Sequence, residues 1–385
     1  MSDLDYKRID SLDLIRGIAI PSILIMNIFS MALPPVAYWV PTWTENAGWV
    51  DMAVHGFQVL FVESRFMSIF TMLFGAGLAL QRDRYQTRGI DPRSYMRRRL
   101  FWLLVFGLVH GLLLWHGDIL TLYAIVGFLV LPATRWGTKR LLIVGSLLIT
   151  IGQIPMILVV IGSVLTGENL MEVPPLPFDA AAVDSARAEW TSLPSRLAVN
   201  AKEYAAMLAA GPIILFWQTA GVMMIGMALY RRGFFSNRDA WKHGVYSLLL
   251  GFIIGVGVLA GRYSVGLKSS AAMGLLGVAM LAGLFMAIGY MSLLVPLASS
   301  SGILARSLRN AGRTAFTLYI SQTIISLLLF VVFLRPMWGT WGRGPLLIYV
   351  FLFAVCQVIF AHWWQTRKGM GPFEALWRKL AGKTD

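Results

Sequence analysis

Long apolar runs separated by short basic segments dominate this sequence of 385 residues. A helix needs about 20 mostly apolar residues to cross a lipid bilayer. The sequence therefore predicts an all-α, polytopic membrane bundle that occupies residues 1–385 as a single integral-membrane domain. Ten segments approach the spanning length, namely residues 12–33, 53–80, 100–115, 118–134, 141–165, 211–230, 244–261, 271–297, 314–334 and 345–365.

The composition excludes several other classes of protein. With 57% hydrophobic and 14% charged residues, the chain does not resemble a soluble globular protein. The net charge of +14 comes from Lys and Arg gathered between the apolar runs, which is typical of membrane topology and not of a nucleic-acid surface. The lipid bilayer is thus the expected partner and nucleic acid is not. A single cysteine, Cys356, excludes an intramolecular disulfide and a CxxC-type metal site, and no metal is expected.

The distribution of Lys and Arg predicts the orientation of the helices. Residues 82–99 carry seven arginines, whereas residues 34–52 carry no Lys or Arg. Basic loops stay in the cytoplasm, so the first segment is predicted inside and the second outside. The basic segments 135–140, 231–242, 306–313 and the C-terminal tail then all lie inside if there are ten spans and both termini are cytoplasmic. An odd number of spans would place one of these clusters outside.

The longest loop, residues 166–210, is predicted to be external. Three prolines interrupt its beginning, and an amphipathic stretch from Ala180 to Met207 is compatible with a helix. This loop either caps the outer face or is a solvated segment without a functional role. No internal repeat is visible, which disfavours a transporter built from inverted repeats.

A short polar group interrupts the apolar residues 100–132. It consists of His110, His116, Gly117 and Asp118. Such groups are costly at bilayer depth, which makes them candidates for a reaction centre or transport gate. A histidine beside a carboxylate is the minimal equipment of a general base. The structural alternative, equally compatible with these residues, is that Asp118 caps the following helix and His110 bonds a neighbouring backbone.

Charged residues also lie near the start of the first apolar segment. Asp13 and Arg16 are three residues apart and face the same side of a helix, so they can pair as an interfacial ion pair. Arg16 precedes Gly17, and a cation beside a residue without a side chain leaves room for a phosphate-bearing ligand. Arg313 lies at the cytoplasmic end of another apolar segment, and the two arginines are candidates to converge on one anion.

The second apolar segment contains Glu63 and Arg65 near its midpoint. The two are predicted to face different sides of the helix and not to pair with each other, and at least one is expected to line a cavity. The sequence Gly75-Ala76-Gly77 predicts a close helix contact. His55, at the outer end of this segment, is expected to be solvated.

Other polar residues within apolar segments are candidates for lining a cavity or for bonding helices together. The sequence lacks a nucleotide-binding glycine loop, an HExxH motif and a GxSxG motif. The cavity candidates, together with Glu63, are Asn27, Gln218, Tyr319 and Gln322.

Several separated motifs resemble those of the YeiB-like bacterial inner-membrane proteins, within the broad superfamily of transmembrane acyltransferases. The resemblance covers nearly the whole chain, as an acyltransferase-like half (residues 1–165), the external loop (166–210) and a YeiB-like half (211–385). The motifs are Leu12 to Ile20 (LDLIRGIAI), Phe66 to Leu78 with LFGAG, His110-Gly111, Gly117 to Leu120 (GDIL), Gly312 to Ala315 (GRTA), Gln322-Thr323, Gly371 to Glu374 (GPFE) and Leu376 to Arg378 (LWR).

This resemblance implies a multi-pass protein of the bacterial inner membrane that transfers an acyl group, often acetyl, from cytosolic acyl-CoA to an acceptor such as a sugar or glycan at the outer face. Acyl-CoA would then be a co-substrate, and no permanently bound cofactor is expected. His110 and Asp118 match the family pattern, whereas His116 stands where a relative carries an acidic residue and ranks below them. Arg16, Arg313 and Arg65 would bind the donor.

The resemblance to heparan-glucosamine acetyltransferase is more distant and lies mainly in the Asp-x-x-Arg-Gly block. The catalytic histidine of that enzyme lies in the first external loop, and this chain has no histidine between Pro34 and Asp51. Two other functions stay open from the sequence. One is a transporter or exporter of a small solute, and the other is a non-catalytic membrane scaffold. The acceptor and the oligomeric state are not predicted.

Overall fold

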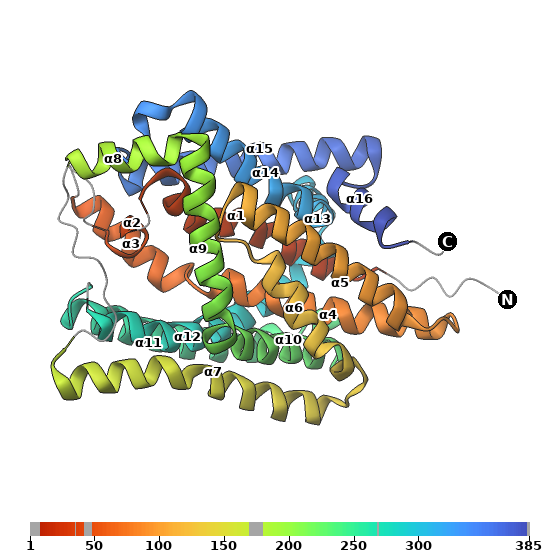
Figure 1. The fold of residues 1–385 in the computed structure, drawn as a ribbon. Helices are drawn as coiled ribbons and strands as arrows, with labels where there is room; N and C mark the ends of the chain where they lie inside the picture. The colour runs from red at the N-terminus through yellow and green to blue at the C-terminus, as the bar shows by residue number, and fades with distance from the viewer. Residues whose placement is uncertain (1–7, 35, 42–47, 169–179, 268, 383–385) are drawn as a thin grey trace.

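A computed structural model describes residues 8–34, 36–41, 48–168, 180–267 and 269–382, and all the regular elements of these residues are helical (Figure 1). The fold prediction of an all-α membrane bundle is therefore confirmed. The α-helices are α1 (Asp10–Ala32), α2 (Val36–Trp39), α3 (Trp49–Phe61), α4 (Arg65–Thr87), α5 (Pro92–Val109), α6 (Leu120–Val130), α7 (Thr138–Thr166), α8 (Ala180–Thr191), α9 (Leu193–Ile214), α10 (Phe216–Arg231), α11 (Trp241–Ser264), α12 (Ser270–Leu294), α13 (Ile303–Arg313), α14 (Ala315–Leu327), α15 (Arg343–Lys368) and α16 (Pro372–Leu380). Shorter turns are π-helical at η1 (His110–Leu114) and η5 (Leu328–Phe333), and 3-10 at η2 (Leu131–Arg135), η3 (Phe234–Ser236), η4 (Pro296–Ser299) and η6 (Arg335–Met337).

Seven helical stretches in the described residues are long and apolar enough to cross a membrane. The pair α9 and α10, bent by 66°, makes an eighth if it is one span. The helix from Leu120 to Arg135 is apolar but shorter. The count of ten spans and the cytoplasmic termini stay predictions, because length and composition alone do not place a helix in a bilayer.

The predicted second span, residues 53–80, is not one continuous helix. It breaks between α3 and α4, where the amides of Val62 and Glu63 both bond the Gln58 carbonyl, at 2.9 and 2.7 Å. Ser64 follows with a left-handed φ of 63°. The break places Glu63 outside a regular helix within the apolar stretch Trp49–Thr87, which apolar periodicity alone does not reveal.

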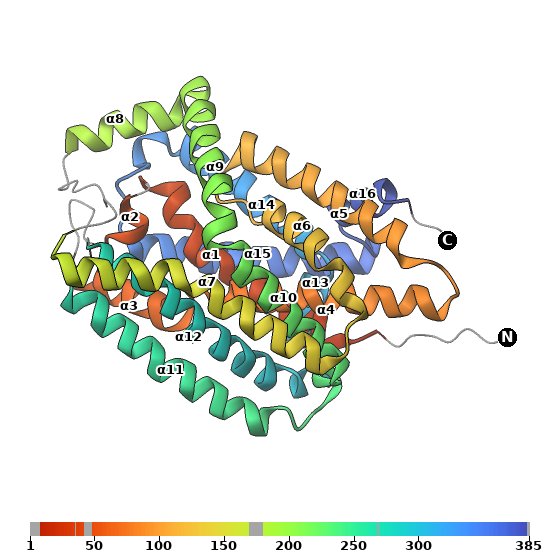
Figure 2. The same ribbon diagram turned by 60° about the horizontal axis from the view of Figure 1, so that its bottom comes forward.

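The stretch from Ala180 to Met207 is helical, as predicted, and forms α8 and most of α9. α9 extends to Ile214, and α10 begins at Phe216, so the predicted sixth segment (211–230) is bent near its start. α9 packs against η1 and runs across the bundle toward α10, with α8 projecting at one end (Figures 1 and 2).

α1 packs against α4, α13, α14 and α15. Glycines allow close helix contacts elsewhere, since a Cβ on Gly75 would lie 2.0 Å from the Met223 carbonyl oxygen, and a Cβ on Gly226 would lie 2.0 Å from that of Met72. The predicted packing role of Gly75 is thus confirmed. α16 and the turn between α4 and α5 lie at one end of the bundle, and α2, α3 and α8 lie toward the other (Figure 1).

Candidate functional site

A cavity of about 480 Å³, here called the basic cavity, opens near α16 and the α4–α5 turn. Seven arginines line it, against two carboxylates, Asp13 and Glu374. The arginines are Arg8, Arg16, Arg84, Arg88, Arg99, Arg313 and Arg378. Such an excess of guanidinium groups favours a polyanionic ligand, because each presents several donors to phosphate or carboxylate oxygens.

Asp13 is the common ion-pair partner of three of these arginines. Its Oδ2 lies 2.6 Å from Nε of Arg8 and 3.4 Å from Nε of Arg313, and its Oδ1 lies 3.5 Å from Nη1 of Arg16. The predicted pairing with Arg16 is therefore confirmed. Arg16 and Arg313 meet at the same carboxylate, and their convergence on a bound anion stays a prediction. The carboxylate side chain is 7% exposed, whereas those of Arg16 and Arg313 are 29% and 31% exposed, which leaves both guanidinium groups accessible to a ligand.

The other carboxylate of the basic cavity, Glu374, is committed to the start of α14. It accepts hydrogen bonds from the amides of Phe316 and Thr317, at 2.7 and 3.1 Å, and from the Thr317 hydroxyl at 2.5 Å. Burial raises the pKa of Glu374 above its usual value, although these hydrogen bonds act in the opposite direction. Glu374 thus stabilises a helix N-terminus and does not pair with the cavity arginines.

Gly17 does not make room for a ligand, and this prediction was wrong. A Cβ on Gly17 would lie 1.8 Å from the Leu308 carbonyl oxygen, and one on Gly312 would lie 1.8 Å from that of Asp13. The two glycines instead let α1 and α13 cross in backbone contact. The contact indirectly supports the site, because it holds Arg16 and Arg313 beside each other.

A second cavity, of about 280 Å³, continues from the basic cavity into the bundle and is here called the apolar cavity. Gly77 lines both cavities, and a Cβ there would meet only Gln81 Nε2, at 4.0 Å. Gly77 therefore borders the cavity, unlike Gly75, which packs against α10. Other residues shared by the two cavities are Arg8, Arg16, Gln81, Arg99, Arg313, Glu374 and Trp377, whereas the deeper walls of the apolar cavity include Ile20, Phe70, Leu73, Leu100 and Leu103.

A third cavity, of about 270 Å³, is here called the inner cavity and shares Ile23, Ile119 and Tyr319 with the apolar cavity. Asp118 and Asn27 are among its polar residues. Glu63 lines it as well, together with Ser22 and Ser64. A basic mouth, an apolar middle and a partly polar inner end are thus connected through shared walls.

His110 and Asp118 are both buried and bonded to each other. Nδ1 of His110 lies 2.9 Å from Oδ1 of Asp118, and its Nε2 lies 2.9 Å from Oγ1 of Thr323 on α14. The other Asp118 oxygen accepts the Thr121 amide at 2.8 Å, so Asp118 also caps the start of α6. The histidine bonds a side chain on a neighbouring helix and not a backbone group.

Of this pair, Asp118 is the residue that borders a cavity. It is among the lining residues of the inner cavity, whereas His110 lines none of the three cavities described above. Both side chains are buried, at 1% exposed for His110 and 0% for Asp118, and both carboxylate oxygens are bonded within the protein. Thr323, in the Gln322-Thr323 motif, was missed as a partner because only the packing of α14 on η1 brings it to His110.

α9 covers the turn that carries this pair. Asn200 donates from Nδ2 to the carbonyls of Gly111 and Leu112, at 2.6 and 2.9 Å, and Tyr204 Oη lies 2.5 Å from Thr121 Oγ1. The π-helical turn η1 leaves carbonyls to be bonded by neighbours, and such turns are frequent at functional sites. Part of the loop 166–210, for which an outer cap and a solvated segment were the alternatives, thus packs over this turn. The side chains of α9 that bond to the turn had not been singled out.

His116 lies apart from the His110–Asp118 pair. Its ring contacts those of Trp115 and Trp190, with centroids 5.9 and 6.3 Å apart, and Nδ1 is buried without a hydrogen-bond partner among the described residues. It packs beneath α8 and lines none of the three cavities, as they are defined above.

Glu63 and Arg65 do not pair through their side chains, as predicted. The Glu63 carboxylate binds Arg262 on α11, at 2.8 and 3.3 Å, and Nη1 of Arg65 donates to the Glu63 carbonyl at 2.5 Å. Arg65 is fully buried beside Met286 and does not line the basic cavity with Arg16 and Arg313. Arg65 begins α4, whereas the α4 residues that line the basic cavity, from Gly77 to Tyr85, lie toward the other end of this helix.

Gln218 and Gln322 bond helices together and line none of the cavities described above. Gln218 accepts from Gln153 on α7 at 2.7 Å, and Gln322 donates to the Ile20 carbonyl and to Gln357, at 3.1 and 2.9 Å. Of the five cavity candidates, Asn27, Glu63 and Tyr319 do line cavities.

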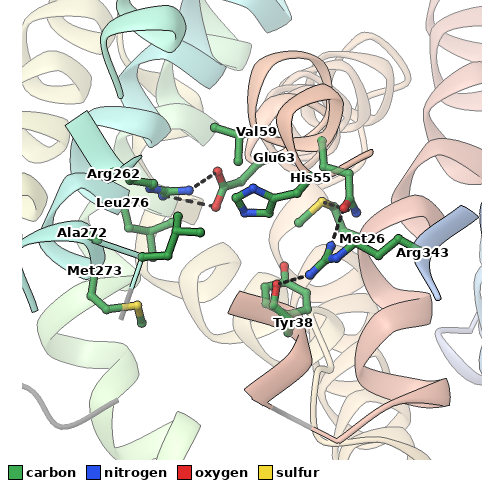
Figure 3. A pocket seen from close by; sticks show the side chains of 12 residues that line it. Met26, Tyr38, His55, Val59, Glu63, Arg262, Ala272, Met273, Leu276 and Arg343 are labelled. Carbon is green, nitrogen blue, oxygen red and sulfur yellow. Dashed lines mark hydrogen bonds and ion pairs between the residues drawn. The ribbon is translucent and has the colours of Figure 1, made fainter. Parts of the chain in front are cut away.

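His55 is buried, which contradicts the expectation of a solvated histidine. Its Nδ1 lies 3.2 Å from Tyr263 Oη, and it lines a small pocket with Arg262 and Arg343 (Figure 3). The two arginines had not been singled out, because each is an isolated charge near the end of an apolar run. In the described part of the chain, no cluster of His, Cys, Asp and Glu suits a metal ion.

The fold and these cavities define a helical membrane protein with an internal, partly charged binding site. YeiB of Escherichia coli K12 is 30% identical over 382 residues, which cover 96% of this chain and 95% of that protein. The chain therefore belongs to the YeiB family. YxaH of Bacillus subtilis is 27% identical, with 97% of this chain and 94% of YxaH covered, and residues 229–384 match the family described as a protein of unknown function (DUF418). Both relatives are titled uncharacterized, and no solved structure matches the chain.

Proposed function

We propose that this protein is a multi-pass acyltransferase of the bacterial inner membrane that uses acyl-CoA from the cytoplasm. The observation that carries the proposal is that the basic, apolar and inner cavities lie in succession, with shared lining residues, as far as Asp118. Acyl-CoA has a polyphosphate head and a long thin arm that ends in the thioester. The head suits the arginines of the basic cavity, and the arm suits the apolar cavity beyond them.

The proposed reaction occurs in the inner cavity. A hydroxyl or amine of the acceptor attacks the thioester carbonyl, the carbon–sulfur bond breaks, and the CoA thiolate leaves and takes up a proton. The proton of the acceptor passes to the His110–Asp118 pair at the edge of the inner cavity. A base must lie within hydrogen-bond reach of the proton it removes, so the acceptor has to approach this buried pair where Asp118 borders the cavity.

The orientation of the site follows from the positive-inside pattern. In this proposal the ten spans and cytoplasmic termini predicted from the sequence place the basic cavity in the cytoplasm. The α8–α9 cap then lies toward the outer face, where a sugar, glycan or other small acceptor would enter.

The direct test is CoA binding and acyl transfer by the purified protein. Arg16→Gln with Arg313→Gln should weaken CoA binding at least tenfold, because a hydrogen bond to a charged group contributes about 1.5–3 kcal/mol. Arg306→Gln, an exposed arginine on α13 outside the three cavities, is the matched control. Unchanged CoA affinity in the double variant would refute the assignment of the basic cavity.

A transporter is the second candidate, because the inner cavity leads on toward the pocket that contains Arg262 and Glu63. It predicts flux of a solute into proteoliposomes without consumption of acyl-CoA. Labelled acetyl-CoA that is hydrolysed or transferred, with no solute flux, would decide for the enzyme.

If charge-neutral replacements of Glu63 and Asp118 left both activities and the cellular phenotype unchanged, a non-catalytic scaffold would be the better explanation.

A further inference from the structure

A small polar pocket lies beyond the inner cavity and is here called the distal pocket (Figure 3). Its volume is about 30 Å³, enough for one small chemical group. In Figure 3 the Glu63–Arg262 pair lies on one side, Arg343 on the other, and the His55 ring between them. The residues come from α3, α11 and α15 and from the break after α3, so tertiary packing alone assembles the pocket.

The distal pocket holds more positive than negative charge. Arg262 is neutralised by Glu63, at 2.8 Å, yet its buried Nε lacks a hydrogen-bond partner among the described residues. Arg343 is 2% exposed, and its guanidinium donates to three neutral acceptors, Gln58 Oε1 and the Ala37 carbonyl at 2.5 Å and the Tyr38 carbonyl at 3.3 Å.

Within the described ranges, no carboxylate forms an ion pair with the Arg343 guanidinium. Asp51 bonds its backbone amide instead, at 2.7 Å. The ring of Phe29, 4.6 Å away, offers only a weak interaction with the cation. A buried charge without a counter-ion costs several kcal/mol, and a bound anion would offset that cost.

The distal pocket and the inner cavity are neighbours and share the lining residues Met26, Tyr38, Glu63 and Leu276. A molecule that occupied both would extend one charged group past these shared residues into the distal pocket. The remainder of that molecule would then lie in the space bordered by Asp118 and Tyr319.

We propose that the distal pocket binds the carboxylate of the acceptor, so that the acceptor is a small organic acid that also carries a hydroxyl or amine. A carboxylate is favoured over a phosphate because the pocket is small and one excess cation matches one negative charge, not two. The planar carboxylate also matches a guanidinium. The assignment of this acid as the acceptor rests on the proposed acyl transfer, whereas its binding does not.

The test compares acids with uncharged counterparts on the purified full-length protein. D-Glucuronate and D-glucose differ only in a carboxylate, and lactate and propane-1,2-diol form a smaller pair. At equal concentration and ionic strength, at least one acid should raise the melting temperature through preferential binding to the folded state, and its neutral counterpart should not. Equal effects within both pairs, or a larger effect of glucose 6-phosphate than of glucuronate, would overturn the proposal.

Variants locate the effect within the molecule. Arg343→Gln should abolish the stabilisation by acid, and Arg343→Lys should retain part of it, because the charge remains but the planar donor pair is lost. Arg335→Gln, at an exposed arginine on η6, should be stabilised by acid as strongly as the wild type. The double Arg16 and Arg313 variant of the basic cavity should show the same stabilisation by acid. Loss of the acid effect in that double variant, with retention in Arg343→Gln, would place the anion in the basic cavity and overturn the proposal.

Glu45, which lies outside the described residues, provides a further control. If acid stabilises Glu45→Gln and not the wild type, the chain supplies its own counter-ion and the proposal fails.

If the protein does not fold with Gln at position 343, the acid and alcohol pairs on the wild type still decide. Acid binding without acyl transfer would refute the proposed enzyme but not the carboxylate site. CoA binding without a preference for acids would refute the carboxylate site but not the proposed enzyme.

Discussion

At the scale of single residues, Asp118 combines two roles that the sequence left as alternatives. It caps α6 through Thr121 and bonds His110, and it also borders the inner cavity. The residue types predicted the pair correctly, since a His and an Asp at bilayer depth require each other or another partner. The second partner of His110, Thr323, depends on how α14 packs on η1, and that was not predictable from local sequence.

We expect Asp118→Asn to abolish acyl transfer while the protein remains folded. The amide keeps one acceptor but presents a donor to His110 or to the Thr121 amide, so stability should fall by about 1–3 kcal/mol. Loss of proton transfer should lower the rate by about 10²–10⁴-fold. Thermal unfolding in detergent and transfer of labelled acetyl measure the two effects, with the exposed Thr166→Val as control. Full transfer activity in Asp118→Asn would remove Asp118 from the mechanism.

The glycine next to Arg16 allows a sharper stability prediction. Gly17→Ala would place a methyl group 1.8 Å from the Leu308 carbonyl oxygen, so α1 and α13 must separate. The loss of stability should reach about 3 kcal/mol or more, at the upper end for overpacking. Gly137→Ala is the matched control, because a Cβ there has nothing within 4 Å. Comparable melting temperatures of the two variants would show that the crossing of α1 and α13 is looser than described.

At the scale of elements, the break between α3 and α4 was the main difference from the sequence prediction. Apolar composition continues across residues 53–80, and neither Gly nor Pro marks the interruption at 62–64. The break is held by tertiary contacts, chiefly the Glu63–Arg262 ion pair and the bonds of Arg65 to Glu63 and Met286. Such contacts come from residues about 200 positions away and leave no local signal.

Ser64 should reveal the cost of this break. A non-glycine residue in the left-handed region costs roughly 1–2 kcal/mol, so Ser64→Gly should raise stability by about 1 kcal/mol after its greater unfolded-state entropy is subtracted. Ser64→Val should lower it, because a β-branched side chain tolerates positive φ poorly. Chemical or thermal unfolding in detergent measures both. A less stable Ser64→Gly together with an unaffected Ser64→Val would indicate that the segment is a regular helix.

At the scale of the whole molecule, the basic cavity and the arginine-rich loops share one end of the bundle. The positive-inside pattern predicts that this end lies in the cytoplasm. With Cys356 replaced by serine, Arg88→Cys should be protected in intact cells from a membrane-impermeant maleimide, whereas Glu168→Cys should react. The C-terminus should support fluorescence of a fused green fluorescent protein and no activity of fused alkaline phosphatase. The reverse labelling pattern would exclude cytosolic acyl-CoA as the donor.

The sequence by itself determined the all-helical membrane class and the pairing of Asp13 with Arg16. These features depend on periodicity and on neighbours within one helix turn, which local sequence records. Only the tertiary structure decided that residues 180–207 form α8 and most of α9, that Gly17 serves a helix crossing, that His55 is buried, that Glu63 meets Arg262 and that three cavities lie side by side. The physical reason is that a buried polar group takes whichever partner the packing brings within hydrogen-bond distance, and packing joins residues hundreds of positions apart.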